Sequence, residues 1–260
     1  MRLVTWNVNS LKMRLPRVLE LLEEHAPDVL CLQETKCAAS AFPHDELAAA
    51  GYRAVDHSGG RWAGVALLAR ADLALEDPRS GLPGEPVQDE SRWIEATIGS
   101  HPPVRLVSVY VPNGREVDSE WYAAKLAFLA AAAARVEALA GTPLVVAGDM
   151  NVAPADLDVY DPAAFVGSTH VTAPERDALE ALQEAGPLVD AFRRLHPDEQ
   201  QFTWWDYRAG HFHKGLGLRI DLALVSADVA ERLTRCGIER PYRKGAKPSD
   251  HAPLVVEWGD

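Results

Sequence analysis

Short apolar runs with polar residues at one end recur along the chain, and each run has the length of a buried strand. The clearest run, residues 144–147, leads through Gly148 to Asp149 and Asn151, and glycine and proline residues flank it on both sides. Such a run bounded by turn signals predicts a fully buried strand. Because side chains alternate along a strand, we expect Asp149 and Asn151 to point to the same side.

Several other predicted strands carry polar residues at one end in the same way. They are residues 1–9 with Asn7, 28–34 with Glu34, 104–111 with Tyr110, 219–225 with Asp221, and 253–258, which follow Asp250 and His251. A lone Asp in such a place is more often a turn cap, and a lone Glu a solvated strand end. The repetition favours a shared ligand site, because buried charges need a partner.

Helical patterns separate these strands. Leucine and valine spacing predicts an amphipathic helix near residues 15–22, with Pro16 in its first turn, and the Ala-rich segment 118–140 predicts a long helix that Gly141 ends. Residues 174–186 and 188–195 continue the helical pattern, whereas 64–69 and 92–98 predict further strands. Because strands and helices alternate without a linker, we expect one α/β domain over residues 1–260, made of two similar halves packed face to face.

Three segments lack this regularity. Residues 77–89 are rich in Pro and Gly and predict an exposed loop, and residues 152–174 form a long connection of the kind that is usually functional. Residues 202–208 concentrate aromatic side chains ahead of a basic loop, 211–219. Aromatic rings beside cations suit base stacking and phosphate contact, although a core position is equally consistent for each ring.

Composition narrows the class of protein. The 47% hydrophobic and 25% charged residues are those of an ordinary globular protein. We expect a cytoplasmic protein that does not enter a membrane, because neither a 20-residue apolar run nor a signal peptide is present. The three cysteines are an odd number without CxxC spacing, so neither a disulfide framework nor a thiolate zinc site is indicated, and we expect them to be reduced. The net charge of −12 argues against a wide polyanion binder, and nucleic acid would need a local basic patch or a metal.

The polar strand ends supply hard oxygen ligands, amides, one phenol and one imidazole. A Gly-rich nucleophile elbow, a dinucleotide fingerprint and a phosphate-binding Walker loop are all missing from the sequence. Carboxylates and amides without clustered His or Cys favour Mg²⁺ or Mn²⁺ over Zn²⁺. Phosphoryl transfer is the reaction that such a metal suits best.

Nine short motifs, in order from residue 3 to residue 256, resemble those of the exonuclease III family of abasic-site endonucleases. They are Trp6-Asn7-Val8-Asn9, Gln33-Glu34-Thr35-Lys36, Gly64-Val65-Ala66, Tyr110-Val111-Pro112-Asn113-Gly114, Gly148-Asp149-Met150-Asn151, Gly167-Ser168-Thr169-His170, Trp205-Asp206-Tyr207-Arg208, Arg219-Ile220-Asp221 and Ser249-Asp250-His251. The resemblance implies a DNase I-like, four-layer α/β sandwich of two mainly antiparallel sheets flanked by helices. The strand–helix alternation alone would have indicated parallel sheets.

The resemblance also implies roles for the polar strand ends. Glu34 is then the principal metal ligand, assisted by Asn7 and Asp250, and the metal is Mg²⁺ with Mn²⁺ as a substitute. Asp149 orients or deprotonates the attacking water. The other catalytic residues implied are Asn151 and His251, which hold the phosphate, Asp221, which orients His251, and Tyr110, which lies near the scissile phosphate.

Further positions match DNA contacts of the family. Trp204 and Leu218 correspond to the lining of a pocket for an extruded abasic sugar, Asn113 to a phosphate contact, and Lys36 and Arg219 to DNA-binding positions. Four residues depart from the family's frequent choices and leave the grip on DNA and the balance of activities open. These departures are Ser10, Lys12, Ala63 and Leu216.

The implied function is a Mg²⁺-dependent, monomeric DNA repair nuclease. It would incise double-stranded DNA 5′ to abasic sites and remove nucleotides or blocking groups from 3′ ends. A related phosphatase or RNase is one alternative. A non-catalytic DNA-binding module is the other, which the retained carboxylates disfavour because negative charge near phosphate weakens binding.

Overall fold

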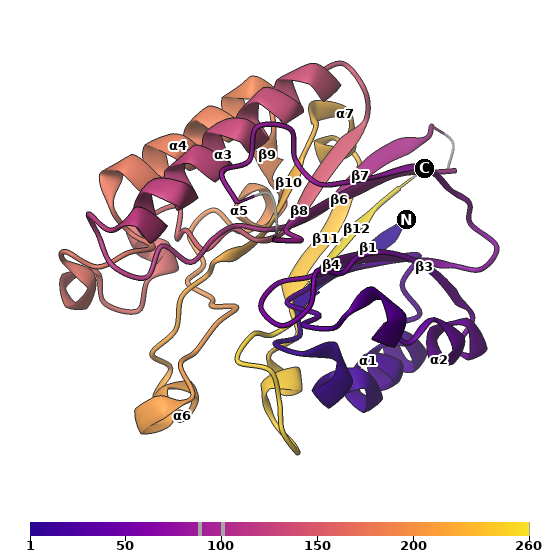
Figure 1. Ribbon diagram of the computed structural model, residues 1–260. Helices are drawn as coiled ribbons and strands as arrows, with labels where there is room; N and C mark the ends of the chain where they lie inside the picture. Colours follow the sequence, from indigo (N-terminus) through magenta and orange to yellow (C-terminus); the bar gives the residue numbers. More distant parts are fainter. Residues whose placement is uncertain (88–89, 100–101, 260) are drawn as a thin grey trace.

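Two six-stranded sheets, packed face to face, form the centre of the protein (Figure 1). The computed structural model describes residues 1–87, 90–99 and 102–259. The first sheet contains β1 (Arg2–Asn7), β2 (Val29–Gln33), β3 (Tyr52–His57), β4 (Val65–Arg70), β11 (Leu233–Ile238) and β12 (Leu254–Trp258). The second sheet contains β5 (Leu75–Ser80), β6 (Trp93–Ile98), β7 (Val104–Tyr110), β8 (Leu144–Asp149), β9 (Val189–Asp190) and β10 (Asp221–Val225).

The two sheets share one plan. Their strand orders are β11-β12-β1-β2-β4-β3 and β5-β6-β7-β8-β10-β9. In each sheet one pair is parallel, β1 with β2 and β7 with β8, and the other pairs are antiparallel. A helix joins each parallel pair, α1 (Leu11–His25) in the first sheet and α3 (Glu120–Leu139) in the second. The expected sandwich of two similar, mainly antiparallel halves is therefore confirmed.

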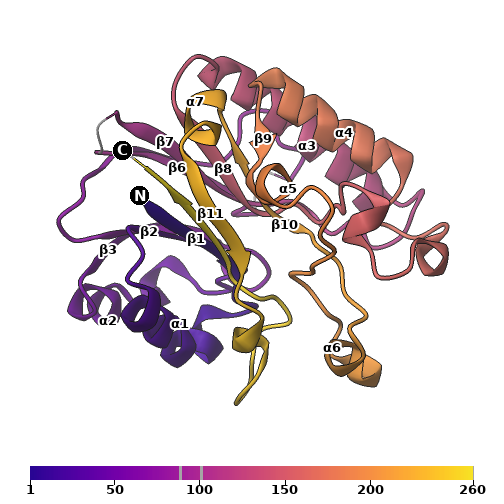
Figure 2. The same cartoon turned by 180° about the vertical axis from the view of Figure 1, so that it is seen from behind.

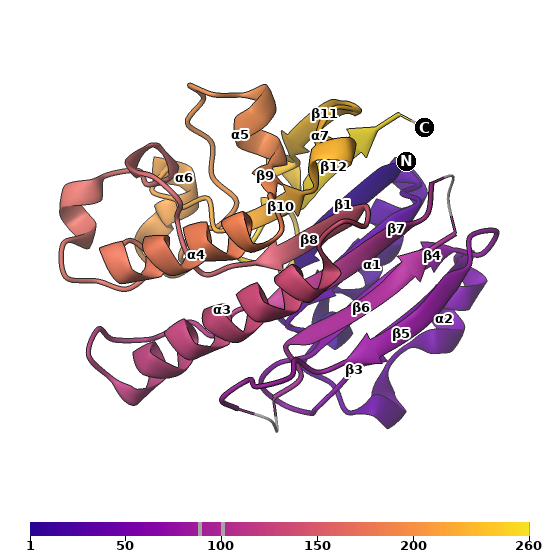
Figure 3. The ribbon, with the colours of Figure 1, turned by 90° about the horizontal axis from the view of Figure 1, so that it is seen from above.

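Helices cover the outer face of each sheet. The remaining helices are α2 (His44–Ala49), α4 (Ala173–Ala185), α5 (Ala191–Leu195), α6 (His211–Lys214) and α7 (Ala227–Ala230). Short 3₁₀ turns occupy Ala39–Ala41, Asp156–Asp158, Pro162–Phe165, Arg208–Gly210 and Arg240–Arg243. In Figures 1 and 3, α1 and α2 lie under the first sheet, and α3 and α4 run side by side across the second.

Burial on both faces explains why the core strands read as continuous apolar runs. Leu3 and Cys31 of the first sheet pack between the sheets with Leu106 and Val145 of the second. The alternate residues of β1 and β2 pack on α1, and those of β7 and β8 on α3 and α4. Because each strand faces apolar layers on both sides, most of its polar residues lie near its ends. Thr5 and Ser108 are buried exceptions, and both are hydrogen-bonded to Gln33.

The ends of two helices follow local rules. Thr172 caps α4 in a capping box with Glu175, and Ser119 caps α3 by accepting a hydrogen bond from the Tyr122 backbone. Helix α1 begins at Leu11, four residues earlier than its predicted core, so Pro16 lies inside the helix and not in its first turn. That detail of the prediction is wrong, because Leu11, four residues before Leu15, is itself buried and extends the apolar period one turn earlier.

Other predictions need correction at the sheet edges. Residues 77–80, expected in a loop, belong to the edge strand β5, which is mostly exposed and irregular between Glu76 and Arg79. The rest of that predicted loop includes residues 88–89, which lie outside the described residues. Segment 188–195, expected as helix throughout, begins with the short strand β9. Edge strands bury one face at most, so their apolar pattern is weak.

The loop that carries α6 projects beyond the ends of both sheets (Figures 1 and 2). None of the helices within the described ranges is long and apolar enough to cross a membrane. All three cysteines are free thiols, as expected.

Candidate active site

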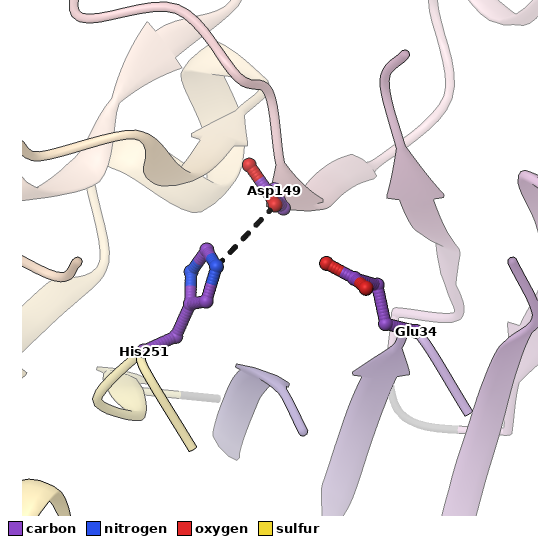
Figure 4. A group of neighbouring side chains, drawn as sticks. All are labelled: Glu34, Asp149 and His251. Atoms are coloured by element: carbon purple, nitrogen blue, oxygen red, sulfur yellow. Dashed lines mark ion pairs between the residues drawn. The ribbon is translucent and has the colours of Figure 1, made fainter. Parts of the chain in front are cut away.

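Polar strand ends from both sheets meet at one edge of the sandwich. Asn7 ends β1, Glu34 directly follows β2, and Asp149 ends β8. Asp221 begins β10 opposite Asp149 in an antiparallel register, and His251 lies three residues before β12. Figure 4 shows that Glu34, Asp149 and His251 point toward one another. We call these five residues the site floor.

Gly148 lets β8 reach this edge. Its φ is +152°, and a Cβ atom at this position would lie 1.9 Å from the backbone oxygen of Val109. Any larger residue would push β8 away from β7 immediately before Asp149. The glycine in the predicted strand end therefore sets the position of the carboxylate.

Glu34 has the left-handed backbone conformation, with φ of 51°. Its carbonyl accepts a hydrogen bond of 2.7 Å from the Ser10 backbone, and the next residue, Thr35, donates 3.1 Å to the Gly64 carbonyl. A long side chain rarely adopts this conformation, and such strain is concentrated at functional sites. The surrounding backbone thus holds Glu34 at a fixed angle over the site.

Asn7 joins the two acidic residues. Its Nδ2 donates to Glu34 Oε1 at 2.8 Å and to Asp149 Oδ2 at 2.9 Å, while its Oδ1 accepts from the Asn9 backbone at 3.0 Å. The amide oxygen is therefore turned away from the carboxylates. Asn7, predicted as a metal ligand, is placed as a hydrogen-bond donor that orients Glu34 and Asp149.

His251 lies between two carboxylates. Its Nδ1 is 2.8 Å from Asp221 Oδ2, and its Nε2 is 3.7 Å from Asp149 Oδ2. Burial alone would lower the pKa of His251, but the charges of Asp221 and Asp149 outweigh it and raise the pKa to about 10. The ring is therefore an imidazolium at neutral pH, with Asp221 fixing its orientation.

Asp149 is almost completely buried, with 1% of its surface exposed. Burial raises its pKa to about 7, against the opposing charge of His251, and the charges of Asp221 and Glu34 add to the rise. A carboxyl group with a pKa near the working pH can accept a proton and release it again. The position suits a general base.

The donor set fits a hard divalent cation. One ligand atom each from Glu34, Asp149 and His251 lie within 4.8 Å of one another. Glu34 supplies the more accessible oxygen donor, because Asp149 is almost completely buried and both its oxygens accept hydrogen bonds, from Asn7 and from the Asn151 backbone. Lys36 Nζ lies 2.5 Å from Glu34 Oε2, so this carboxylate already attracts a cation in the structure. A metal held by Glu34 would compete with that ammonium group.

Asp250, also predicted as a ligand, has both carboxylate oxygens engaged in hydrogen bonds. Its Oδ1 accepts from Asn9 Nδ2 at 2.9 Å, and its Oδ2 accepts from Trp204 Nε1 at 3.1 Å. Asn9 Oδ1 in turn accepts from Lys36 Nζ at 2.6 Å. Asp250 therefore connects the site floor to Trp204. Asn9, to which the sequence assigned no role, is the residue that links Lys36 to Asp250.

Tyr110 and the two asparagines lie beside Asp149. Burial raises the pKa of Tyr110, and the charge of Glu34 adds to it, so the phenol keeps its proton and can donate. Asn113 Nδ2 donates to Asn151 Oδ1 at 3.2 Å, and Asn151 Nδ2 donates to the Val111 carbonyl at 2.8 Å. Each amide still has a second N–H for a ligand oxygen.

A buried ion pair, which the sequence did not reveal, supports these asparagines. Lys125 and Glu175 are completely buried and bonded to each other. Lys125 Nζ donates to the Asn151 carbonyl at 2.6 Å and to the Asn113 carbonyl at 3.4 Å. The only signals in the sequence are a lone Lys in an Ala-rich helix and the Glu of a capping box. Neither one indicates its partner.

A cavity of about 340 Å³ adjoins the site. It is lined by Arg115, Glu116, Val117, Tyr160, Phe165, Gly167, Ser168, Thr169, His170, Trp204, Asp206, Arg208, His211 and Leu216. Trp204 was predicted here. Leu218 was also predicted, but it is completely buried in the apolar cluster beneath Trp204, and Leu216 lines the cavity.

Arg219 does not reach the surface. Its guanidinium is buried and forms ion pairs of 2.7 Å with Asp158 and 2.8 Å with Asp190. This placement corrects the prediction of a DNA contact, because an arginine held by two carboxylates inside the fold cannot bind phosphate.

Comparisons with known proteins cover the whole chain. The model of the Endonuclease/Exonuclease/phosphatase family matches residues 4–251. Exodeoxyribonuclease III of Haemophilus influenzae is 33% identical over 99% of this chain and 100% of its own length. The solved structure of the 3′ phosphatase NExo from Neisseria, bound to a product DNA hairpin, is 37% identical with a TM-score of 0.95. An AP endonuclease from Archaeoglobus fulgidus is 36% identical with a TM-score of 0.94. Both structures align over 100% of each chain.

Proposed function

The chain belongs to the Endonuclease/Exonuclease/phosphatase family, and we propose that it is a Mg²⁺-dependent DNA repair nuclease. It hydrolyses the phosphodiester bond 5′ to abasic sites in duplex DNA. It also removes nucleotides and phosphate groups from 3′ ends. The observation that carries the proposal is Asp149, a buried carboxylate with a raised pKa, held between the amide of Asn7 and the imidazolium of His251.

Each residue of the site floor has a task in phosphodiester hydrolysis. Asp149 orients the attacking water and accepts its proton as the oxygen approaches phosphorus. His251 carries a positive charge that stabilises the developing charge on the phosphate oxygens. Asp221 keeps that charge in place through its hydrogen bond to Nδ1. The hydroxyl of Tyr110 and the amides of Asn113 and Asn151 supply neutral donors to the phosphate.

The donor set supports a hard divalent metal held by Glu34, with Asp149 beside it as the proton acceptor. When bound, Mg²⁺ polarises a phosphoryl oxygen and neutralises charge in the transition state, and Mn²⁺ is a chemically similar substitute. Lys36 forms an ion pair with Glu34. Asn7 donates hydrogen bonds to both Glu34 and Asp149 and so holds their carboxylates together.

The cavity beside Trp204 supports selection of abasic sites. An abasic nucleotide loses less pairing and stacking energy on extrusion than a normal one, so it can enter such a cavity at a lower cost. The relatives named above include an exodeoxyribonuclease, a 3′ phosphatase and an AP endonuclease. We therefore assign incision and 3′-end removal to the same site.

We expect a monomer, because helices or the opposing sheet cover the sheet faces within one chain.

Three duplexes of equal length test the proposal: one with an abasic site, one with a 3′ phosphate and one undamaged. With Mg²⁺ we expect incision 5′ to the abasic site and release of the 3′ phosphate, and with EDTA we expect neither product. Glu34→Ala should require more Mg²⁺ for the same rate, because one hard ligand is lost. Cleavage of phosphomonoesters or RNA in preference to all three duplexes would favour the related phosphatase or RNase. Binding without any product would favour the non-catalytic module.

A further inference from the structure

A second groove adjoins the site and lies between two exposed tryptophans. Its volume is about 490 Å³, and its lining includes Glu34, Tyr110 and Asn113 of the site together with Trp62 and Trp121. The groove therefore begins where the reacting phosphate is proposed to lie. A strand of nucleic acid whose phosphate lies at the site can continue into it.

The exposure of these two side chains is unusual in this fold. Trp62 is 68% exposed and Trp121 is 43% exposed, whereas Trp6, Trp93 and Trp205 are at most 1% exposed. Large aromatic side chains contribute most when they are buried, and two exposed ones beside a polar groove are typical of a binding surface. Neither ring contributes to the hydrophobic core clusters of the protein's described part.

Each of the two rings lies next to an arginine. The guanidinium carbon of Arg115 is 3.8 Å from the ring centre of Trp121, and that of Arg61 is 5.3 Å from the ring centre of Trp62. Within the described residues, no carboxylate forms an ion pair with either arginine. Arg115 lines the groove, and Arg61 directly precedes Trp62, which lines it. In a chain with a net charge of −12, these two arginines, unpaired among the described residues, supply local positive charge at the groove and beside it.

The other cations of the groove are already engaged. Lys36 is paired with Glu34, and Arg92 is paired with Glu90 and donates to the Tyr110 carbonyl at 3.2 Å. Among the described cations that line the groove, Arg115 is therefore the one available for a phosphate, and Arg61 adds a second cation beside Trp62.

We propose that this groove binds unpaired nucleotides of single-stranded DNA by stacking their bases on Trp62 and Trp121. Aromatic platforms beside free cations are the means by which proteins bind single strands without sequence preference. In a duplex the faces of each base are covered by neighbouring bases, so only an unpaired base offers a flat surface to an indole ring. The proposal rests on the proposed function and deepens it, since it selects DNA with a single-stranded flank at the reacting phosphate.

Binding is measured by fluorescence anisotropy with labelled oligothymidylate in EDTA, where cleavage cannot interfere. Trp62→Leu and Trp121→Leu should each weaken binding by roughly tenfold, because stacking on one ring is lost. Trp62→Phe and Trp121→Phe retain an aromatic ring and should recover most of the affinity. All four substitutions are at exposed positions, and unchanged melting temperatures would confirm intact folding.

A second oligomer separates stacking from charge. It has the same length and phosphate charge but carries no bases, and we expect it to bind the parent protein about as weakly as oligothymidylate binds the Leu variants. Equal affinity of the parent for both oligomers would overturn the proposal, since the groove would then be an electrostatic surface only. Equal affinity of parent and Leu variants for oligothymidylate would overturn it as well.

The two proposals can fail separately. In Mg²⁺, the Leu variants should cleave a duplex with a single-stranded 3′ extension about tenfold more slowly than the parent, while a fully paired abasic duplex is cleaved at the parental rate. Loss of both rates alike would contradict the groove's role in selecting unpaired DNA. If the parent protein binds oligothymidylate through the two rings but cleaves neither duplex, the proposed groove stands and the proposed nuclease function is wrong.

Discussion

The site floor and the cavity beside it are built in different ways. The floor residues lie at strand ends and are joined by side-chain hydrogen bonds that run from Glu34 through Asn7 to Asp149 and from His251 to Asp221. The cavity wall, which we call the rim, comes from loops 115–117, 160–170 and 204–216. On the rim, Arg208 is 87% exposed, and its ion-pair partner among residues 1–87, 90–99 and 102–259 is its near neighbour Asp206.

This difference separates chemistry from selection. The register of the strands fixes the positions of the floor side chains closely enough for hydrogen bonds to form between them. Activation of an attacking water requires this precision. A loop can change length and side chains without moving the floor, so the rim is where related proteins can differ in substrate. Trp204 joins the two regions, because its indole N–H is bonded to Asp250.

The largest effect expected from the floor is that of Asp149→Asn. The variant keeps the shape of the side chain but loses the charge and the proton acceptor, and a general base contributes about 10²–10⁴-fold. Single-turnover cleavage of abasic DNA should fall by roughly a hundredfold or more. Binding in Mg²⁺ should stay equal or improve, because one negative charge near the phosphate is removed.

A smaller loss would change the assignment. If cleavage by Asp149→Asn drops by less than about tenfold, Asp149 is neither the base nor the water-orienting group. His251 paired with Asp221 would then be the better candidate. Thermal melts of parent and variant in parallel provide the folding control.

The buried pair beneath the floor should matter for stability. Lys125→Met leaves Glu175 as an uncompensated buried charge, which costs about 3–5 kcal/mol in comparable pairs. We expect the free energy of unfolding in urea to fall by about that amount. The double variant Lys125→Met/Glu175→Gln should lose less than the single one, because no charge remains unpaired. Additive losses would show that the pair is not coupled.

The same pair predicts a dependence on pH. Burial alone would raise the pKa of Glu175, but Lys125 outweighs it and lowers the pKa from 4.5 to about 2. A lowered pKa in the folded state means that the stabilisation is present above the ordinary value and is lost as the pH falls. The stability difference between parent and Glu175→Gln should therefore shrink between pH 4.5 and 2. A constant difference over that interval would contradict the assignment.

A rim substitution should act on substrate choice. Trp204→Ala should slow incision at abasic sites by about tenfold, as expected when one well-placed aromatic contact is lost, and should leave nonspecific duplex binding nearly unchanged. Trp204→Phe keeps a ring but lacks the N–H that bonds to Asp250, so it separates the pocket contact from the hydrogen bond. Equal losses in incision and duplex binding would make Trp204 a structural residue.

The smallest expected effect is that of replacing Lys36, whose ammonium group forms an ion pair with Glu34 where a metal would bind. Lys36→Gln removes a competitor for the metal, and partly exposed ion pairs of this kind are worth at most about 1 kcal/mol. The Mg²⁺ concentration for half-maximal cleavage should therefore fall by about twofold to fivefold. An increase would indicate that Lys36 supports the metal site and does not compete with it.

Much of the fold could be predicted from the apolar pattern, because the core strands are buried on both faces. The pattern missed β3, β11 and α2, each of which has only one buried residue and therefore weak periodicity. The alternation of strands with helices indicated parallel sheets, and only the family resemblance implied antiparallel ones. Strand pairing depends on contacts between distant segments, which local periodicity does not encode.

The candidate site was predictable at the strand ends and less so in its details. The pattern brought Glu34, Asp149 and His251 to one place, but the orientation of Asp250 depends on Asn9, which lies 241 residues away in sequence. Arg219 ends the basic loop behind the aromatic segment and matches a family motif, which suggested a DNA contact, yet its partner Asp158 is 61 residues away. A charged residue in a motif can serve the fold or the ligand, and only its tertiary partners decide which.

One paired measurement tests the separation of floor and rim most directly. Asp149→Asn and Trp204→Ala are assayed for single-turnover cleavage and equilibrium binding on the same two duplexes, one with an abasic site and one with a 3′ phosphate. The account predicts that Asp149→Asn loses cleavage of both duplexes by roughly a hundredfold with binding intact. Trp204→Ala should lose mainly incision at the abasic site and retain release of the 3′ phosphate. The same pattern of losses in both variants would contradict the division of chemistry and selection between the two regions.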